Sequence, residues 1–132
     1  MDEILDYLKN AKTYYLATVD GDGNPQVRPF GTATKFEDRL YIQTGKVKKV
    51  SRQMLAHPRV AICAMGADGS WLRLEADAVE DDRVEARRAV LDDYPDLAGM
   101  YQADDGNCQV FALKHAHAVI ASFTGAPREF TF

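Results

Sequence analysis

Six or seven short strand-like segments, joined mostly by turns, limit the fold of this chain more than any other feature of its sequence. Residues 13–19 are rich in β-branched and aromatic side chains, and a second extended run at residues 26–35 follows a turn dense in Asp and Gly. This pattern predicts a hairpin, and residues 60–65 and 71–78 predict another. Because helices interrupt only a few connections, an antiparallel β-barrel with peripheral helices is favoured over a parallel βαβ sheet.

The helices expected from the sequence are short. Apolar residues recur at helical spacing over residues 2–10, which predicts an amphipathic helix against one end of the sheet. Asp82 and Glu85 resemble a capping box, and they predict a helix that runs to about residue 93. Pro95 suits the first turn of a second short helix.

The strand after the second hairpin turn alternates, so that Trp71 and Arg73 lie on one face and leucine and alanine residues lie on the other. The last strands are expected at residues 109–113 and 116–123. The tail beyond Gly125 is expected to be irregular. Together these segments predict a mainly β fold with six or seven strands.

Length and charge narrow the functional class. With 132 residues and 46% hydrophobic content, the chain suits one compact domain. A net charge of −4 argues against a general binder of nucleic acid or of anionic membranes. The chain's first residues are acidic and lack a long apolar h-region, and no run approaches the ~18 apolar residues of a membrane span. We therefore expect a cytoplasmic protein.

Cysteine and histidine give little indication of a metal site. Cys63 and Cys108 lie in apolar runs without C-x-x-C spacing, so reduced and buried thiols are expected. His115 and His117 alternate on an extended run and could face one metal ion, but no third ligand is evident. Solvated histidines on a strand are the simpler interpretation.

Residues 40–58 carry the clearest indication of a binding site. They read as a strand that passes through a Thr-Gly turn into a short helix, with Lys46, Lys48 and Lys49 in its first turn. Unpaired amides and the helix dipole already make a helix N-terminus positive, so lysines there favour an anion. Thr44 adds a hydroxyl, and the combination suits a phosphate group. A solvated basic helix end is the alternative.

The second expected strand has an unusual composition for the centre of a sheet. Pro29 removes a backbone donor, and Gly31 is typical of a bulge or of close approach by a flat ligand. Arg28, Phe30 and Thr32 are expected to share one face of this strand. Such a strand is compatible with a bulge or with a flat ligand close to its backbone.

Five segments of the sequence resemble the pyridoxamine 5′-phosphate oxidase-like FMN-binding split-barrel family, and within it the small branch related to 5-nitroimidazole resistance proteins. They occur in the family's order across most of the chain, at residues 15–19, 24–30, 40–45, 57–60 and 71–76. The resemblance implies a Greek-key split barrel, a homodimer, and FMN in a cleft at the subunit interface.

The resemblance also implies roles for individual residues. Arg28 matches the family's phosphate-binding arginine, with Pro29 and Phe30 along the flavin ring. Gln43 and Thr44 match a pair beside the ring and the phosphate.

Lys48 and Lys49 occupy the family's Ser-Arg positions, and Val50 replaces the usual lysine, so Lys46 is expected to compensate. Trp71 falls where the family places a residue that reaches FMN from the other subunit, and Arg73 shares its face. Ordinary barrel packing is the alternative for Trp71.

Two functions follow from the resemblance. One is an FMN-dependent oxidoreductase acting on a small molecule such as a nitro-aromatic compound, with NAD(P)H as a candidate electron donor. The other is a non-catalytic flavin-binding, electron-carrying or sensor module, and a deazaflavin or haem in place of FMN is a further variant. Pyridoxamine phosphate oxidase activity is not expected, because a C-terminal substrate segment bearing Trp and Arg is absent and Trp71 is the sole tryptophan.

Overall fold

The computed structural model describes residues 1–132, and its architecture is mainly β, as predicted. Three α-helices, one 3-10 helix and eight strands follow one another along the chain: α1 (Asp2–Ala11), β1 (Tyr14–Val19), β2 (Pro25–Phe30), β3 (Thr34–Phe36), β4 (Arg39–Gly45), α2 (Lys49–Ala56), β5 (Arg59–Met65), β6 (Trp71–Glu80), α3 (Val84–Asp93), η1 (Pro95–Gly99), β7 (Cys108–Ala121) and β8 (Arg128–Thr131). No helix combines the length and the apolar character needed to cross a membrane.

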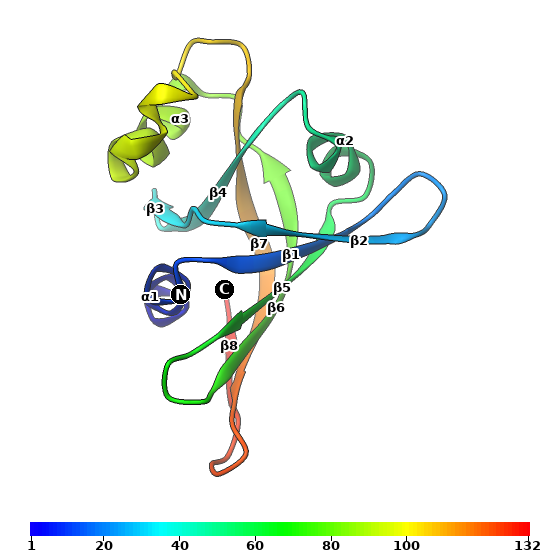
Figure 1. The fold of residues 1–132 in the computed structure, drawn as a ribbon, viewed down its shortest axis with the longest axis vertical. Helices are drawn as coiled ribbons and strands as arrows, with labels where there is room; N and C mark the ends of the chain where they lie inside the picture. The colour runs from blue at the N-terminus through cyan, green and yellow to red at the C-terminus, as the bar shows by residue number, and fades with distance from the viewer.

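The strands form one antiparallel, curved sheet (Figure 1). Its order is β2-β1-β5-β6-β7-β4-β3, and β8 pairs with β7. Strands β2 and β3 lie at opposite ends of this order, yet they are joined by only residues 31–33. The four steps from Phe30 to Thr34 span at most about 14 Å, so the two ends of the sheet must come together. The result is a barrel with a split beside β2.

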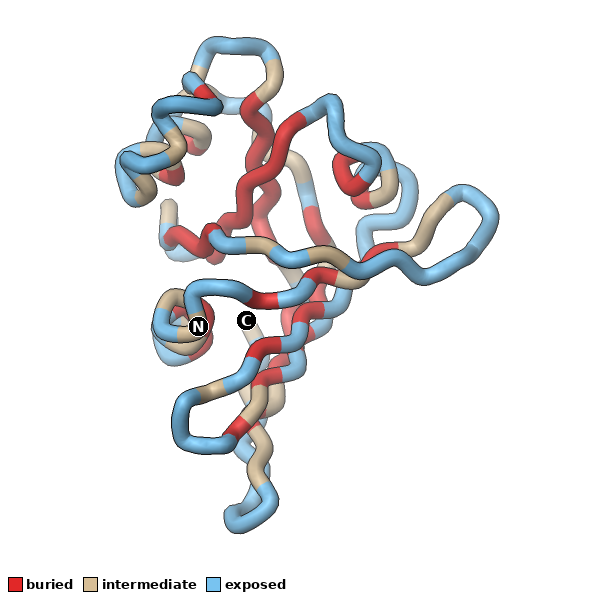
Figure 2. Tube along the Cα trace, viewed as in Figure 1, coloured by how far each residue is buried: buried red, intermediate tan, exposed pale blue.

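The core fills the inside of this curved sheet. Inward-facing positions alternate along β5 and β6, and Figure 2 shows this alternation of buried and exposed residues. Helix α1 covers one end through Ile4, Leu5 and Leu8, as predicted. Helix α3 packs outside β4 and β7 through Ala86 and Val90.

Several boundaries differ from the sequence-based expectation. The run at residues 26–35 is divided into β2 and β3, and the tail after Gly125 forms β8, which makes eight strands rather than six or seven. The expected strands at 109–113 and 116–123 are one strand, β7, with a kink at His115, whose φ is 50°. The sequence pattern indicates a break near His115, but it does not show that strand pairing continues on both sides of the break as one strand.

The capping box expected at Asp82 and Glu85 is not formed. Helix α3 begins at Val84 with Arg83 as its N-cap and has no side-chain cap. The Asp82 carboxylate instead accepts a hydrogen bond from Arg87 Nη1 at 3.2 Å. Both cysteines are free, as expected, but Cys63 is exposed because it occupies an outward position of β5.

Candidate functional site

A cavity of about 390 Å³ opens at the split of the barrel, within the size range of small-molecule sites. Its walls come from β2 and the following residues, from β4, from the start of α2, and from the α3–η1 segment. The lining residues are Arg28, Pro29, Phe30, Gly31, Thr32, Gln43, Thr44, Lys48, Val50, Asp93, Tyr94, Pro95, Asp96, Leu97, Met100 and Tyr101. Six of the ten predicted site residues therefore meet in one cavity.

Strand β2 supplies one wall and lies at one end of the strand order. It pairs only with β1, and none of its residues is buried, as Figure 2 shows. Its second backbone edge has no strand partner, so amides and carbonyls on that edge are open to a ligand. Pro29 and Phe30 lie on this wall.

Arg28 brings a partly buried cation to the cavity. Its Nη1 donates to Thr18 Oγ1 at 2.7 Å and to the Leu16 carbonyl at 3.3 Å, and its Nη2 donates to Gln53 Oε1 at 2.7 Å. All three acceptors are neutral, and no carboxylate pairs with the guanidinium. Burial lowers the pKa of Arg28, as expected for a cation that lacks an anionic partner.

The N-terminus of α2 faces the same cavity. Lys48 is the N-cap residue in an extended conformation, and the helix has neither a side-chain cap nor an acidic residue in its first turn. Lys48 lines the cavity, whereas Lys49 is exposed and lies outside the lining. Lys46 precedes the helix rather than joining its first turn, and its Nζ lies 4.0 Å from Asp82.

Buried polar side chains of β4 form the floor. Gln43 and Thr44 are 7% and 3% exposed and both line the cavity. The Gln43 backbone amide donates to Thr32 Oγ1 at 3.0 Å, and its Nε2 donates to the Thr44 carbonyl at 2.9 Å. The Gln43 Oε1 and Thr44 Oγ1 atoms have no hydrogen-bond partner within the chain. Every side-chain N or O atom that is fully shielded from solvent does have a partner, so these two oxygens are not fully shielded. These two oxygens are therefore open to the cavity.

The α3–η1 segment closes the far end. The Tyr94 hydroxyl donates to the Ala33 carbonyl at 3.1 Å and accepts from the Ala33 amide at 3.0 Å. Asp93 accepts from Lys9 Nζ at 2.6 Å and from Thr34 Oγ1 at 2.9 Å. These contacts fix the wall, and local sequence patterns did not predict them because they join segments far apart in the chain.

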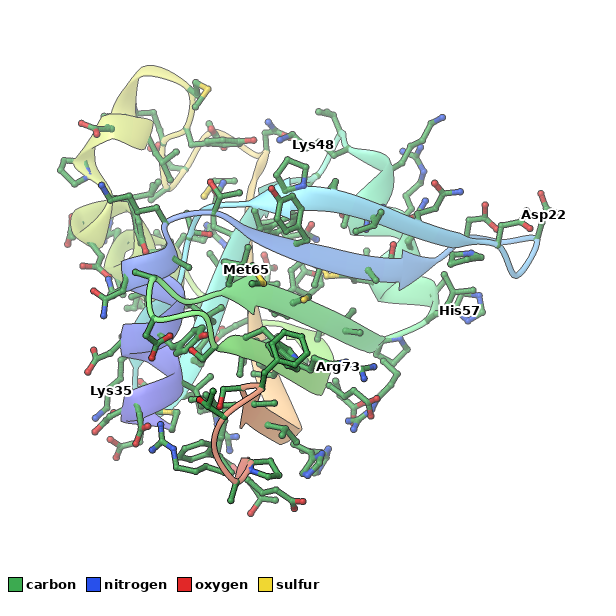
Figure 3. All side chains as sticks on the ribbon, turned by 60° about the horizontal axis from the view of Figure 1, so that its bottom comes forward. Asp22, Lys35, Lys48, His57, Met65 and Arg73 are labelled. Atoms are coloured by element: carbon green, nitrogen blue, oxygen red, sulfur yellow. The ribbon has the colours of Figure 1, made fainter.

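Trp71 and Arg73 lie elsewhere in this chain. Pairing across the strands places one row of residues on the outer face of the sheet: Pro29, Tyr15, Cys63, Arg73 and Val119. Arg73 is three strand spacings, or about 14 Å, from Pro29 on that row. Figure 3 shows Arg73 and Lys48 well apart, with the β1–β2 hairpin between them.

The outer face carries exposed apolar side chains around a second hollow of about 310 Å³, which Trp71, Arg73, Glu75 and His117 help to line. The Trp71 ring packs against Phe123 with centroids 5.0 Å apart, and Phe123 is itself 94% exposed. An apolar face of this kind usually marks an interaction surface.

No group of three His, Cys, Asp or Glu side chains is placed to hold a metal ion. His115 Nδ1 lies 2.9 Å from Asp77, and this contact, together with Arg59, lowers the pKa of Asp77. His117 Nε2 faces Glu129 at 3.4 Å. Each histidine thus faces a different carboxylate.

Comparisons with known proteins agree with this architecture. A family model described as pyridoxamine 5′-phosphate oxidase matches residues 1–119. A NimC/NimA family protein from Clostridium acetobutylicum is 38% identical, with a TM-score of 0.96 over 100% of this chain and 92% of that chain. No curated protein matches.

More distant structures share the fold alone. An F420 reductase is 22% identical, with a TM-score of 0.62 over 82% of this chain and 89% of that chain. A heme storage protein from Vibrio cholerae is 18% identical, with a TM-score of 0.66 over 85% of this chain and 87% of that chain.

Proposed function

Because the chain belongs to the pyridoxamine 5′-phosphate oxidase family, and within it to the branch of NimC/NimA proteins, we propose that it binds FMN in the cavity at the split and acts as an oxidoreductase of a small molecule. The observation that carries this proposal is Arg28, a partly buried cation that shares the cavity with the uncapped N-terminus of α2 and has no anionic partner. An anion is the missing component of such a site.

The phosphate of FMN fits the basic end of the cavity. Arg28 and Lys48 supply charged donors, and the N-terminus of α2 supplies backbone amides with a favourable dipole. Arg28 is partly buried, and a charge-assisted hydrogen bond there is stronger than at an exposed surface, whereas Lys48 is exposed at the rim.

The flavin ring fits the remainder. Phe30, Val50, Leu97 and Met100 give the cavity apolar walls, while the open edge of β2 offers backbone groups to the ring's polar atoms. When bound, the flavin supplies the electron-transfer chemistry. The chain's own residues bind the cofactor, orient it and exclude water from one side of the ring.

A second copy of the chain would complete this site. Strand β2 has no buried residue, and the outer face exposes Tyr15, Met65 and Phe123. A two-fold axis would cover both regions at once, because each copy presents the same face to the other. Trp71 and Arg73 of one copy would then reach the cavity of the other, which one chain alone does not allow.

The substrate class and the electron donor are proposed from the family resemblance rather than from a side chain of this cavity. A small electrophile such as a nitro-aromatic compound would enter above the ring, and NAD(P)H is the candidate donor. The cavity lining contains no His or Cys. A non-catalytic flavin carrier or sensor is therefore the alternative function.

The absorbance spectrum of the purified protein tests the proposal, with and without added FMN and then with reduced nicotinamide. Flavin bands that shift on binding and bleach with NAD(P)H, then recover with a nitro-aromatic acceptor, support an oxidoreductase. Bands that shift without turnover indicate the carrier or sensor. Preferential binding of a deazaflavin or haem, as the names of the distant F420 reductase and heme storage neighbours suggest, would replace FMN as the cofactor.

A further inference from the structure

We propose that Tyr101 is a ligand-binding residue, whose phenol donates a hydrogen bond to the phosphate group at the N-terminus of α2. This inference rests on the proposed function, because FMN supplies that phosphate. It adds a donor from the loop between η1 and β7, a part of the chain in which the sequence motifs assign no binding role.

The Tyr101 hydroxyl lacks a hydrogen-bond partner in the chain. The residue is 9% exposed and lines the cavity. Since no fully occluded side-chain oxygen is left unsatisfied, this hydroxyl is not sealed in the core, and the residue that carries it lines the cavity. A buried tyrosine hydroxyl normally has a partner, so its position indicates that a ligand provides one.

The absence of a side chain at Gly45 allows the hydroxyl to reach this position. A Cβ built on Gly45 would lie 2.9 Å from Tyr101 Oη and 3.1 Å from Asn107 Nδ2. The hydroxyl therefore lies directly over the end of β4. At this point the chain turns into α2, with the Lys48 amide donating to the Gly45 carbonyl at 3.0 Å.

Other groups with unused hydrogen-bonding capacity line the same cavity. Thr44 precedes Gly45, is almost fully buried, and turns an unpartnered hydroxyl to the cavity. The uncapped first turn of α2 begins after Lys48. Two hydroxyls, a helix N-terminus and a lysine around one cavity suit an oxygen-rich anion, and a phosphate monoester accepts hydrogen bonds from groups of each kind.

The loop that carries Tyr101 is fixed without the ligand. The Asp105 carboxylate accepts hydrogen bonds from the backbone amides of Gln102 at 2.9 Å, Asn107 at 2.7 Å and Cys108 at 2.7 Å. These bonds lower the pKa of Asp105 and keep its charge occupied with the backbone. Tyr101 is consequently held in place before binding, which reduces the entropy lost when the ligand arrives.

The test compares Tyr101→Phe with Tyr94→Phe by titrating flavin fluorescence with FMN and with riboflavin. Both tyrosines line the cavity, but the Tyr94 hydroxyl is satisfied by the Ala33 backbone. We expect Tyr101→Phe to weaken FMN about tenfold to a hundredfold, as for a hydrogen bond to a charged group, and to leave riboflavin nearly unchanged. Tyr94→Phe should affect both flavins alike.

A second measurement keeps the inference independent of the flavin ring. Inorganic phosphate should raise the melting temperature of wild type and of Tyr94→Phe more than that of Tyr101→Phe. Equal stabilisation of all three proteins, or equal weakening of FMN and riboflavin in Tyr101→Phe, would overturn the role of Tyr101. Wild type that is stabilised by phosphate but binds neither flavin would overturn the proposed function alone, and the phosphate response of Tyr101→Phe would then decide the role of Tyr101.

Discussion

Arg28 and Arg83 carry the same side chain into opposite surroundings. Arg83 donates to Glu37 Oε2 at 2.8 Å and to Asp81 Oδ2 at 2.8 Å, and both carboxylates lie within this chain. Arg28 donates only to neutral oxygens, and its own burial lowers its pKa, whereas the two carboxylates raise the pKa of Arg83. The carboxylate partners of Arg83 lie within the protein. An arginine beside a cavity that has no carboxylate partner, such as Arg28, is available to an anionic ligand.

The same contrast holds for two tyrosines. Tyr41 Oη donates to Asp81 at 2.7 Å, in the cluster that Arg83 forms with Glu37 and Asp81. Tyr101 Oη has no partner within the chain, and the residue lines the cavity. Sequence reports the residue type in both cases, but only the structure shows whether hydrogen-bonding capacity has been used.

The largest expected effect comes from replacing Arg28, with Arg83 as its control. Arg28→Ala should weaken FMN about tenfold to a hundredfold and spare riboflavin, since a charged hydrogen bond to phosphate contributes about 1.5–3 kcal/mol. Arg83→Ala should leave both affinities unchanged, because its partners lie in the protein. Fluorescence titration with both flavins measures these affinities. Equal losses of affinity for FMN and riboflavin in Arg28→Ala would contradict a specific role of Arg28 in binding the phosphate.

A comparable effect is expected at the outer face. Trp71→Ala should raise the dimer dissociation constant at least tenfold, because an aromatic anchor near the centre of an interface is a typical hot spot. Leu55→Ala, an equally conservative loss of an exposed apolar side chain on α2, is the matched control. Sedimentation velocity at micromolar concentration measures both. A wild-type monomer that holds FMN tightly would remove the shared site.

Replacing Tyr41 tests the contribution of its hydrogen bond to Asp81 to stability. Burial and the bond to Asp81 raise the pKa of Tyr41 to about 12. The phenol's folded pKa lies above its unfolded value of about 10, so its stabilisation is complete below pH 10 and is lost as pH rises toward 12. Tyr41→Phe should lower the free energy of unfolding by about 1–3 kcal/mol near pH 8. In urea titrations, the difference from wild type should shrink between pH 10 and 12, and a constant difference would contradict this role.

The smallest effect is expected beyond the cavity wall. Lys49 and Arg52 are exposed on α2, and neither lines the cavity. Lys49→Ala and Arg52→Ala should each change the FMN affinity by a few tenths of a kcal/mol, and the change should vanish at high salt. Lys48→Ala should cost more than either. A Lys49 effect as large as that of Arg28 would show that the bound anion extends outside the cavity of one chain.

Local patterns predicted most of the fold. Alternation and turn residues located β1, β2, β5 and β6, because these strands pair through short hairpins. The tail strand β8 was missed, since it has four residues and depends on pairing with β7. Cys63 was expected to be buried because an apolar run does not reveal which face of a strand is turned outward.

Prediction of the site was limited in the same way. Arg28, Gln43, Thr44 and Lys48 were indicated by nearby motifs, and the structure brings them to one cavity. Tyr94 and Tyr101 were not, because their roles depend on contacts with Ala33 and Gly45, each more than fifty residues away. When the role of a residue depends on contacts with distant parts of the chain or with another subunit, its neighbours in the sequence do not reveal that role.

The central claim is that the cavity at the split recognises a phosphate on a flat ligand. Isothermal titration of the wild-type protein with FMN and with riboflavin, at the same low salt concentration, tests it most directly. The account predicts that FMN binds at least tenfold more tightly and that the difference narrows as salt or inorganic phosphate is added. Equal affinities for the two flavins, unchanged by phosphate, would contradict it.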